Sequence, residues 1–261
     1  MDADDASHPE CLAEQARLFE ARPEIGVVGC LGAFGGDRSV GGGFARHVDW
    51  LNTLITPEQI ALNRFIESPF AHPSVRFRRE VVRSCGAYRN GDFPEDCELW
   101  RRWAAAGGRM GKVPRVLLTC SDSPGRLSRT DPQYAVEAFY RMKAEYIARE
   151  LARLRHPLPS GVSATIPPGR PVFIWGAGRP TRKRAGYLDA HGMAIAGHID
   201  IDARKIGRRI TGRPVIAADA LPPPGAAFVL GHVASRGARE LIRGRLAARG
   251  YVEGVDFLMC A

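Results

Sequence analysis

The sequence predicts an α/β protein with two folded parts joined by a proline-rich linker. Its 261 residues exceed the roughly 150 residues of an average domain, which favours one large domain or two small ones. Residues 156–171 contain five prolines, a composition typical of a linker. Beyond residue 171, short apolar runs alternate with helical patterns, and this alternation indicates a parallel sheet covered by helices.

Apolar periodicity and capping residues predict the elements of the first part. In chain order these are helix 8–22, strand 24–31, glycine-rich loop 32–43, helix 56–63, strand 74–77, helical turn 79–85, helix 95–106, strand 113–119 and helix 131–154. Thr56 and Asp131 are each followed by proline, the arrangement of an N-cap before the first helical position. In helix 95–106, Leu99, Trp100 and Trp103 share one apolar face, so both tryptophans are expected in the core.

The second part predicts strands separated by helices. These elements are strand 172–175, helix 181–191, strand 195–200, strand 227–230 and helix 235–249. We therefore divide the chain into residues 1–130, a helix and linker over 131–170, and a domain over 171–261.

Composition excludes several classes of protein. The hydrophobic fraction of 45% and charged fraction of 25% are those of ordinary globular proteins. No run approaches the roughly 18 apolar residues of a membrane span, and the acidic N-terminus does not resemble a secretory signal. The six cysteines lack the spacing of a zinc site. We expect a cytoplasmic protein, with contact to the inner face of a membrane left open.

The net charge of +9 is unevenly distributed. Residues 161–261 hold 15 Lys and Arg against 7 Asp and Glu, so most of the positive charge belongs to the second part. Arginine grips phosphate oxygens in pairs, but an arginine-rich codon usage explains the same composition. No nucleic-acid-binding motif accompanies the charge, and we expect no nucleic-acid partner.

Two groups of acids in the first part suggest chemistry. Asp2 and Asp4 flank one residue, so their side chains point to one side of an extended backbone and suit a hard divalent cation. Glu95 and Asp96 begin a helix, where carboxylates are favoured. The simpler alternatives are a solvated acidic terminus for the first pair and helix capping for the second.

Six motifs in order resemble the family 2 glycosyltransferases, which have the GT-A fold. The motifs are the aspartate-any-aspartate segment 1–12, the Pro-Glu-Ile-Gly segment 22–29, the His-Pro-Ser segment 69–79, the Gly-Ala-Tyr turn 85–88, the acidic segment 95–100 and the late loop 124–129. The resemblance covers residues 1–130. It implies transfer of a sugar from a nucleotide-sugar donor to a hydroxyl acceptor, which could be a glycan, a lipid-linked sugar or a small molecule.

The resemblance also implies residue roles. Asp2 and Asp4 would hold Mg²⁺ or Mn²⁺ against the donor diphosphate, and Asp96, with Glu95 beside it, would be the base that deprotonates the acceptor. His72 would line the donor site and Arg129 would reach the diphosphate.

The chain departs from the family pattern at two places. Ser123 stands where family members often have a histidine before the late loop. Met1 stands at the end of the strand that precedes the aspartate motif, so only the acceptor-side part of a GT-A domain is expected here. We therefore expect the chain as written to have little or no transferase activity.

A second motif opens the basic part. Gly176-Ala177-Gly178 follows an apolar strand, and Asp200, or Asp202, follows about 22–24 residues later, near the spacing of a ribose-binding acid. The segment resembles the Rossmann-like modules found on sugar-modifying enzymes. Thr181 replaces the third glycine of the dinucleotide motif, so a turn without cofactor is an equal alternative to a nucleotide or NAD(P) site. A non-catalytic nucleotide-binding module and an NAD(P)-linked oxidoreductase are thus the alternatives to the transferase.

Overall fold

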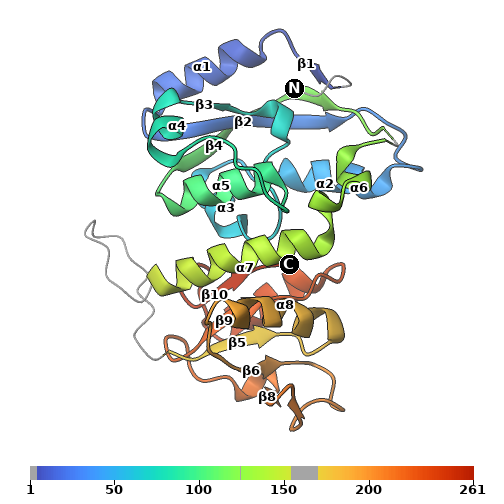
Figure 1. Cartoon of the computed structure of the whole chain (residues 1–261), viewed down its shortest axis with the longest axis vertical. Coiled ribbons are helices and arrows are strands. Elements are labelled where there is room, and N and C mark those ends of the chain that lie inside the picture. The colour runs from blue at the N-terminus through green and yellow to red at the C-terminus, as the bar shows by residue number, and fades with distance from the viewer. Residues whose placement is uncertain (1–4, 124, 154–169) are drawn as a thin grey trace. The chain divides into compact units, whose positions relative to one another are not determined.

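The computed structural model describes residues 5–123, 125–153 and 170–261. The chain folds into two units, Met1–Phe139 and Tyr140–Ala261 (Figure 1). Each is a mixed α/β unit and is described separately. The expected linker, 156–171, lies almost wholly outside the described residues.

Unit 1 contains a four-stranded mixed sheet in the order β1-β4-β2-β3. The strands are β1 (Ala6–Ser7), β2 (Ile25–Phe34), β3 (Arg76–Phe77) and β4 (Arg109–Cys120). The long strands β2 and β4 are parallel, and the two short strands pair with them in antiparallel fashion. Because β2 and β4 run the same way, both end at one edge of the sheet.

Helices cover the sheet of unit 1 (Figure 1). They are α1 (Cys11–Ala21), α2 (Gly42–Leu51), α3 (Pro57–Asn63), α4 (Arg79–Cys85), α5 (Glu95–Ala105) and α6 (Leu127–Thr130), with 3₁₀ turns η1 (His72–Ser74) and η2 (Pro132–Tyr134). Neighbouring residues of β2 face opposite sides: Val28 packs with Cys11 of α1, whereas Val27 packs with Trp100 and Trp103 of α5. The expected core positions of the tryptophans are confirmed.

Three expected elements of unit 1 are wrong in detail. Strand β2 and helix α2 extend into the segment expected to be a loop. The His-Pro-Ser segment forms the turn η1 rather than the start of a strand. The helix expected from Asp131 is interrupted: Asp131 caps only η2, Ala135 is extended, and α7 runs over Val136–Arg153. The extended backbone of Ala135 (ψ 145°) prevents one continuous helix.

Unit 2 contains a six-stranded sheet in the order β10-β9-β5-β6-β8-β7. The strands are β5 (Val172–Trp175), β6 (Ile195–Ile199), β7 (Arg209–Ile210), β8 (Arg213–Ile216), β9 (Phe228–Gly231) and β10 (Phe257–Met259), and the helices that follow α7 are α8 (Arg179–Ala190) and α9 (Ala238–Ala248), with the 3₁₀ turn η3 (Ala218–Ala220). All pairs are parallel except β7 with β8. The strands β8 and β10 were not anticipated.

The connections of unit 2 place a switch point at its central strand. From β5 the chain proceeds outward through β6 and β8, and it then returns to the other side of β5 to form β9 and β10. In open parallel sheets, ligands bind outside the carboxyl ends of the strands at such a reversal. Within the described part of the chain, no helix is both long enough and apolar enough to cross a membrane.

Candidate active site

Asp96 lies in the first turn of α5, half-buried in unit 1. Its Oδ2 accepts a hydrogen bond from Ser68 Oγ at 3.3 Å, and its Oδ1 accepts one from the Cys97 backbone at 2.7 Å. Burial raises the pKa of Asp96, and nearby His72 partly opposes this effect. A carboxylate with a raised pKa is a better proton acceptor, which is the property a general base needs.

Glu95 has a different environment from its neighbour. Its Oε2 accepts hydrogen bonds from Tyr134 Oη and Gln133 Nε2, both at 2.7 Å. Because both donors lie in η2, Glu95 ties the start of α5 to the segment that follows the late loop. The structure thus separates the paired acids: Glu95 is an anchor, and Asp96 faces the remaining polar side chains.

His72 and Tyr88 contact each other close to Asp96. The Nε2 atom of His72 is 2.8 Å from Tyr88 Oη, and the His72 ring packs edge-on against Trp100 with centroids 6.0 Å apart. Burial raises the pKa of Tyr88, and the charges of Asp96 and Glu95 add to the increase. The expected site residue His72 therefore belongs to the surroundings of Asp96.

Three further residues lie around this site, and two of them, His47 and Glu67, were not anticipated. Burial lowers the pKa of His47 on α2, whereas Glu67 and Asp96 act in the opposite direction and Arg126 adds to the decrease. Glu67, Arg126 and Asp96 therefore all lie within electrostatic range of His47. No local motif distinguishes His47 or Glu67, because only the fold brings them together.

The late loop is held by its own side chains. Arg129 donates to Asp122 Oδ1 at 2.6 Å and to the Ser123 carbonyl at 3.0 Å, while the Arg126 guanidinium lies 3.9 Å from the Phe44 ring centroid. Arg129 was expected to contact a diphosphate. In the structure two of its nitrogens bond within the loop, and the contact with a diphosphate stays a prediction.

The expected metal ligands Asp2 and Asp4 lie outside the described residues. The next acid, Asp5, accepts a hydrogen bond at Oδ1 from the Ser121 backbone at 2.8 Å, directly after β4. Asp5 also contributes to the raised pKa of Cys120, after burial. Among the residues that the structure describes, no group of three or more His, Cys, Asp or Glu side chains is arranged to hold a metal.

A second candidate site lies in unit 2, where a cavity of about 530 Å³ opens at the carboxyl ends of β5 and β6. Gly176 and Gly178 both line it. Gly176 has φ +111°, and a Cβ there would lie 2.8 Å from Val233 and 2.9 Å from Thr181, so glycine is required. Thr181 Oγ1 in turn donates to the His232 carbonyl at 3.4 Å.

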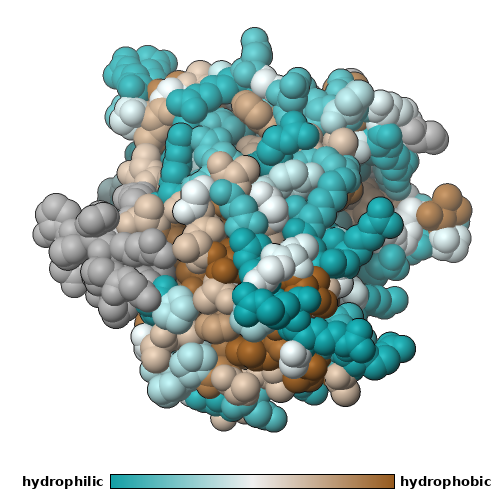
Figure 2. All heavy atoms as spheres, turned by 60° about the horizontal axis from the view of Figure 1, so that its bottom comes forward, coloured by the Kyte–Doolittle hydropathy of each residue, from teal (hydrophilic) through white to brown (hydrophobic). Residues whose placement is uncertain are grey.

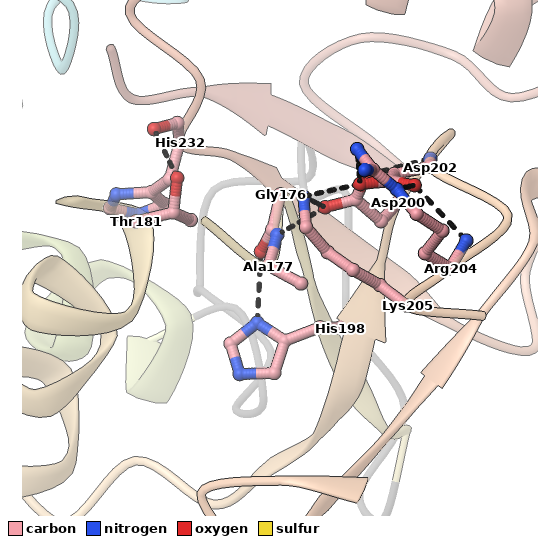
Figure 3. Close-up of polar contacts among 9 residues, drawn as sticks. All are labelled: Gly176, Ala177, Thr181, His198, Asp200, Asp202, Arg204, Lys205 and His232. Atoms are coloured by element: carbon pink, nitrogen blue, oxygen red, sulfur yellow. Dashed lines mark hydrogen bonds and ion pairs between the residues drawn. The ribbon is translucent and has the colours of Figure 1, made fainter. Parts of the chain in front are cut away.

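Asp200 closes the glycine turn from inside (Figure 3). Its Oδ2 accepts from the Ala177 backbone at 2.9 Å and lies 3.1 Å from Lys205 Nζ, while its Oδ1 accepts from the Asp202 backbone at 2.9 Å. Burial acts to raise the pKa of Asp200, but these donors hold it below the usual value. Asp200 was expected to contact a ribose. It lines the cavity, yet both of its oxygens are engaged within the protein.

Comparison with known proteins points to one class of enzyme. No family model matches the chain. It is 28% identical over 133 residues to an uncharacterized glycosyltransferase of Haemophilus influenzae, covering 49% of this chain and 46% of that protein. It is also 28% identical over 120 residues to the amylovoran biosynthesis glycosyltransferase AmsE of Erwinia amylovora, covering 45% and 42%. The chain thus spans less than half the length of either relative.

Proposed function

We propose that the protein takes part in glycosyl transfer, and that Asp96 of unit 1 is the base that deprotonates a hydroxyl acceptor. The observation that carries the proposal is the position of Asp96: it begins α5, its pKa is raised by burial, and it faces Ser68 and His72. Similarity to two glycosyltransferases supports the reaction class.

The proposed reaction is an inverting transfer from a nucleoside-diphosphate sugar. Asp96 accepts the proton of the acceptor hydroxyl, whose oxygen bonds to the anomeric carbon as the bond to the diphosphate oxygen breaks on the opposite face. Ser68 and His72 orient the carboxylate. Glu95 does not share the proton transfer, because its Oε2 is held by Tyr134 and Gln133.

The proposal includes a divalent cation, because the first residues of the chain are rich in aspartate. Carboxylate oxygens are the ligands that Mg²⁺ and Mn²⁺ prefer, and the anchored Asp5 adjoins Asp4 in the chain. In the proposal Asp2 and Asp4 hold the cation, which when bound neutralises the charge that develops on the diphosphate.

We also propose a domain type for each unit. Unit 1 corresponds to the acceptor-side part of a GT-A domain, residues 1–130, and unit 2 to a Rossmann-like domain, residues 171–261. The parallel pairing of β2 with β4 and the reversal of strand order at β5 support these assignments.

The test measures release of nucleoside diphosphate from UDP-, GDP- and dTDP-sugars with Mn²⁺, with glycans and lipid-linked sugars as acceptors. Asp96→Asn should lower turnover by about 10²–10⁴-fold, the usual contribution of a general base. Asp49→Asn, an exposed acid paired with Arg38, is the control and should leave turnover unchanged. The chain as written is expected to release little product, so the comparison is between variants: release by Asp96→Asn equal to that of the wild-type chain would refute the assignment of the base.

A further inference from the structure

The cavity of unit 2 has the charge of an anion site. Arg184, Lys205 and Arg245 line it, together with one carboxylate, Asp200. Lys205 offsets Asp200 at 3.1 Å. Arg184 lies 4.0 Å from the Tyr140 ring centroid and donates to the His232 carbonyl. Arg245 has no ion pair with any residue in the described ranges. The two arginines therefore leave a positive charge at the cavity.

The N-terminus of helix α8, which begins at the cavity, also favours an anionic ligand. Gly178 is the N-cap of the 12-residue α8, with no side-chain capping bond and no acid in the first turn. A helix N-terminus presents unpaired N–H donors and a positive dipole end. A Cβ at Gly178 would have only Pro180 within 4 Å, at 3.9 Å. There is accordingly space beside these donors for an anionic group.

The remaining walls of the cavity are apolar. Ile201 and Leu241 line it although they are 68% and 70% exposed, and Val233 and Ile242 lie behind. Figure 2 shows that apolar surface lies among hydrophilic side chains on one face of the molecule. Large exposed apolar side chains beside a cation-lined cavity suit a ligand that carries a flat, weakly polar ring as well as an anionic group.

Asp200 decides which nucleotides fit. In dinucleotide sites the acid after the second strand accepts hydrogen bonds from a ribose. Here three of its roughly four acceptor positions are filled by Ala177, Asp202 and Lys205, so the carboxylate cannot accept from both hydroxyls of a ribose without losing a bond that holds the turn closed.

We propose that this cavity binds a nucleoside mono- or diphosphate, with its phosphate at Gly178, Arg184 and Arg245 and its base between Ile201 and Leu241. Asp200 is a clamp on the turn and not a ligand of the ribose. Because dinucleotide sites rely on that ribose contact, the site should favour mononucleotides, held by phosphate and base, over NAD and NADP. The proposal is independent of sugar transfer by unit 1.

The experiment is isothermal titration of the whole protein with AMP, ADP, UMP, UDP, GDP, NAD⁺, NADP⁺ and inorganic phosphate. EDTA is present, so that cation-dependent donor binding in unit 1 does not contribute. At least one mononucleotide should bind at least tenfold more tightly than both dinucleotides and inorganic phosphate.

Two variants and one control locate the binding. Gly178→Asp supplies a capping carboxylate at a position whose backbone, φ −70° and ψ 161°, accepts any residue, so it should preserve folding and weaken nucleotide binding more than tenfold. Arg245→Gln should weaken binding by about tenfold. Arg208→Gln removes an exposed arginine outside the cavity and should change nothing. The proposal would be overturned if no nucleotide bound, if inorganic phosphate bound as tightly as the nucleotides, or if NAD⁺ or NADP⁺ bound more tightly. It would also be overturned if Gly178→Asp bound the nucleotide as tightly as the wild-type protein.

Discussion

Replacing Lys112 with methionine should stabilise unit 1 near neutral pH and flatten the pH dependence of its unfolding. Lys112 is only 4% exposed, within β4. Its Nζ donates to the Leu51 carbonyl at 2.6 Å and lies 5.4 Å from the Phe70 ring centroid. Along the described chain no carboxylate pairs with it. Methionine keeps the volume and removes the buried amine.

The magnitude follows from the pKa of Lys112. Burial lowers it from 10.5 to about 7, with Cys30 opposing. Between these pH values the unfolded chain binds one more proton than the native chain, so stability rises with pH and is lost as pH falls through 7. The whole interval corresponds to about 5 kcal/mol at roughly 1.4 kcal/mol per pH unit, of which about 2 kcal/mol falls between pH 7 and pH 9.

The assay is urea denaturation at pH 7 and pH 9, followed by tryptophan fluorescence. At pH 7, Lys112→Met should unfold at a higher urea concentration than the wild-type protein. Between pH 7 and pH 9 the free energy of unfolding of the wild-type protein should rise by about 2 kcal/mol from this group, and the variant should lack that rise. Arg46→Met, which removes an exposed charge from α2, controls for net charge. A variant with the pH slope of wild type, or one less stable at pH 7, would refute the reasoning.

Three other predictions concern stability and the late loop. Gly176→Ala should destabilise unit 2 by about 2–4 kcal/mol in urea denaturation, because a positive φ and a 2.8 Å contact with Val233 both oppose a Cβ; a loss below 0.5 kcal/mol would contradict this. Thr56→Ala removes a capping box with Gln59 and should cost about 1 kcal/mol; an unchanged denaturation midpoint would count against the cap. Tyr134→Phe loses the bond to Glu95 and should speed tryptic cleavage in the late loop about fivefold, as expected for about 1 kcal/mol, whereas unchanged cleavage would show that the bond does not hold the loop.

Elements with a strong local pattern were predictable from the sequence. Helix α5 follows from the shared apolar face of Leu99, Trp100 and Trp103, and α3 from Thr56 and the proline after it. The helix expected from Asp131 failed because the extended Ala135 separates η2 from α7, and capping residues do not report how far a helix continues.

The candidate sites were predictable only in part, because their neighbours come from distant parts of the chain. The family resemblance singled out Asp96 and the spacing after the glycine turn singled out Asp200. Their surroundings follow from the fold: His72 and Ser68 lie near the first, and the Ala177 backbone donates to the second. The hydrogen-bond partners of each acid are fixed by packing, which the local sequence does not report.

The central position of β5 also bears on how unit 2 folds. Its residues 172–175 pair with β6 on one side and with residues 228–231 of β9 on the other. The second pairing joins segments far apart in the chain, and such non-local contacts slow folding. During synthesis β5 leaves the ribosome before β9. Until β9 follows, one edge of β5 stays unpaired and can associate with other chains. Charged residues beside an exposed strand oppose such association, and α8, which begins at Arg179 shortly after β5, carries several of them.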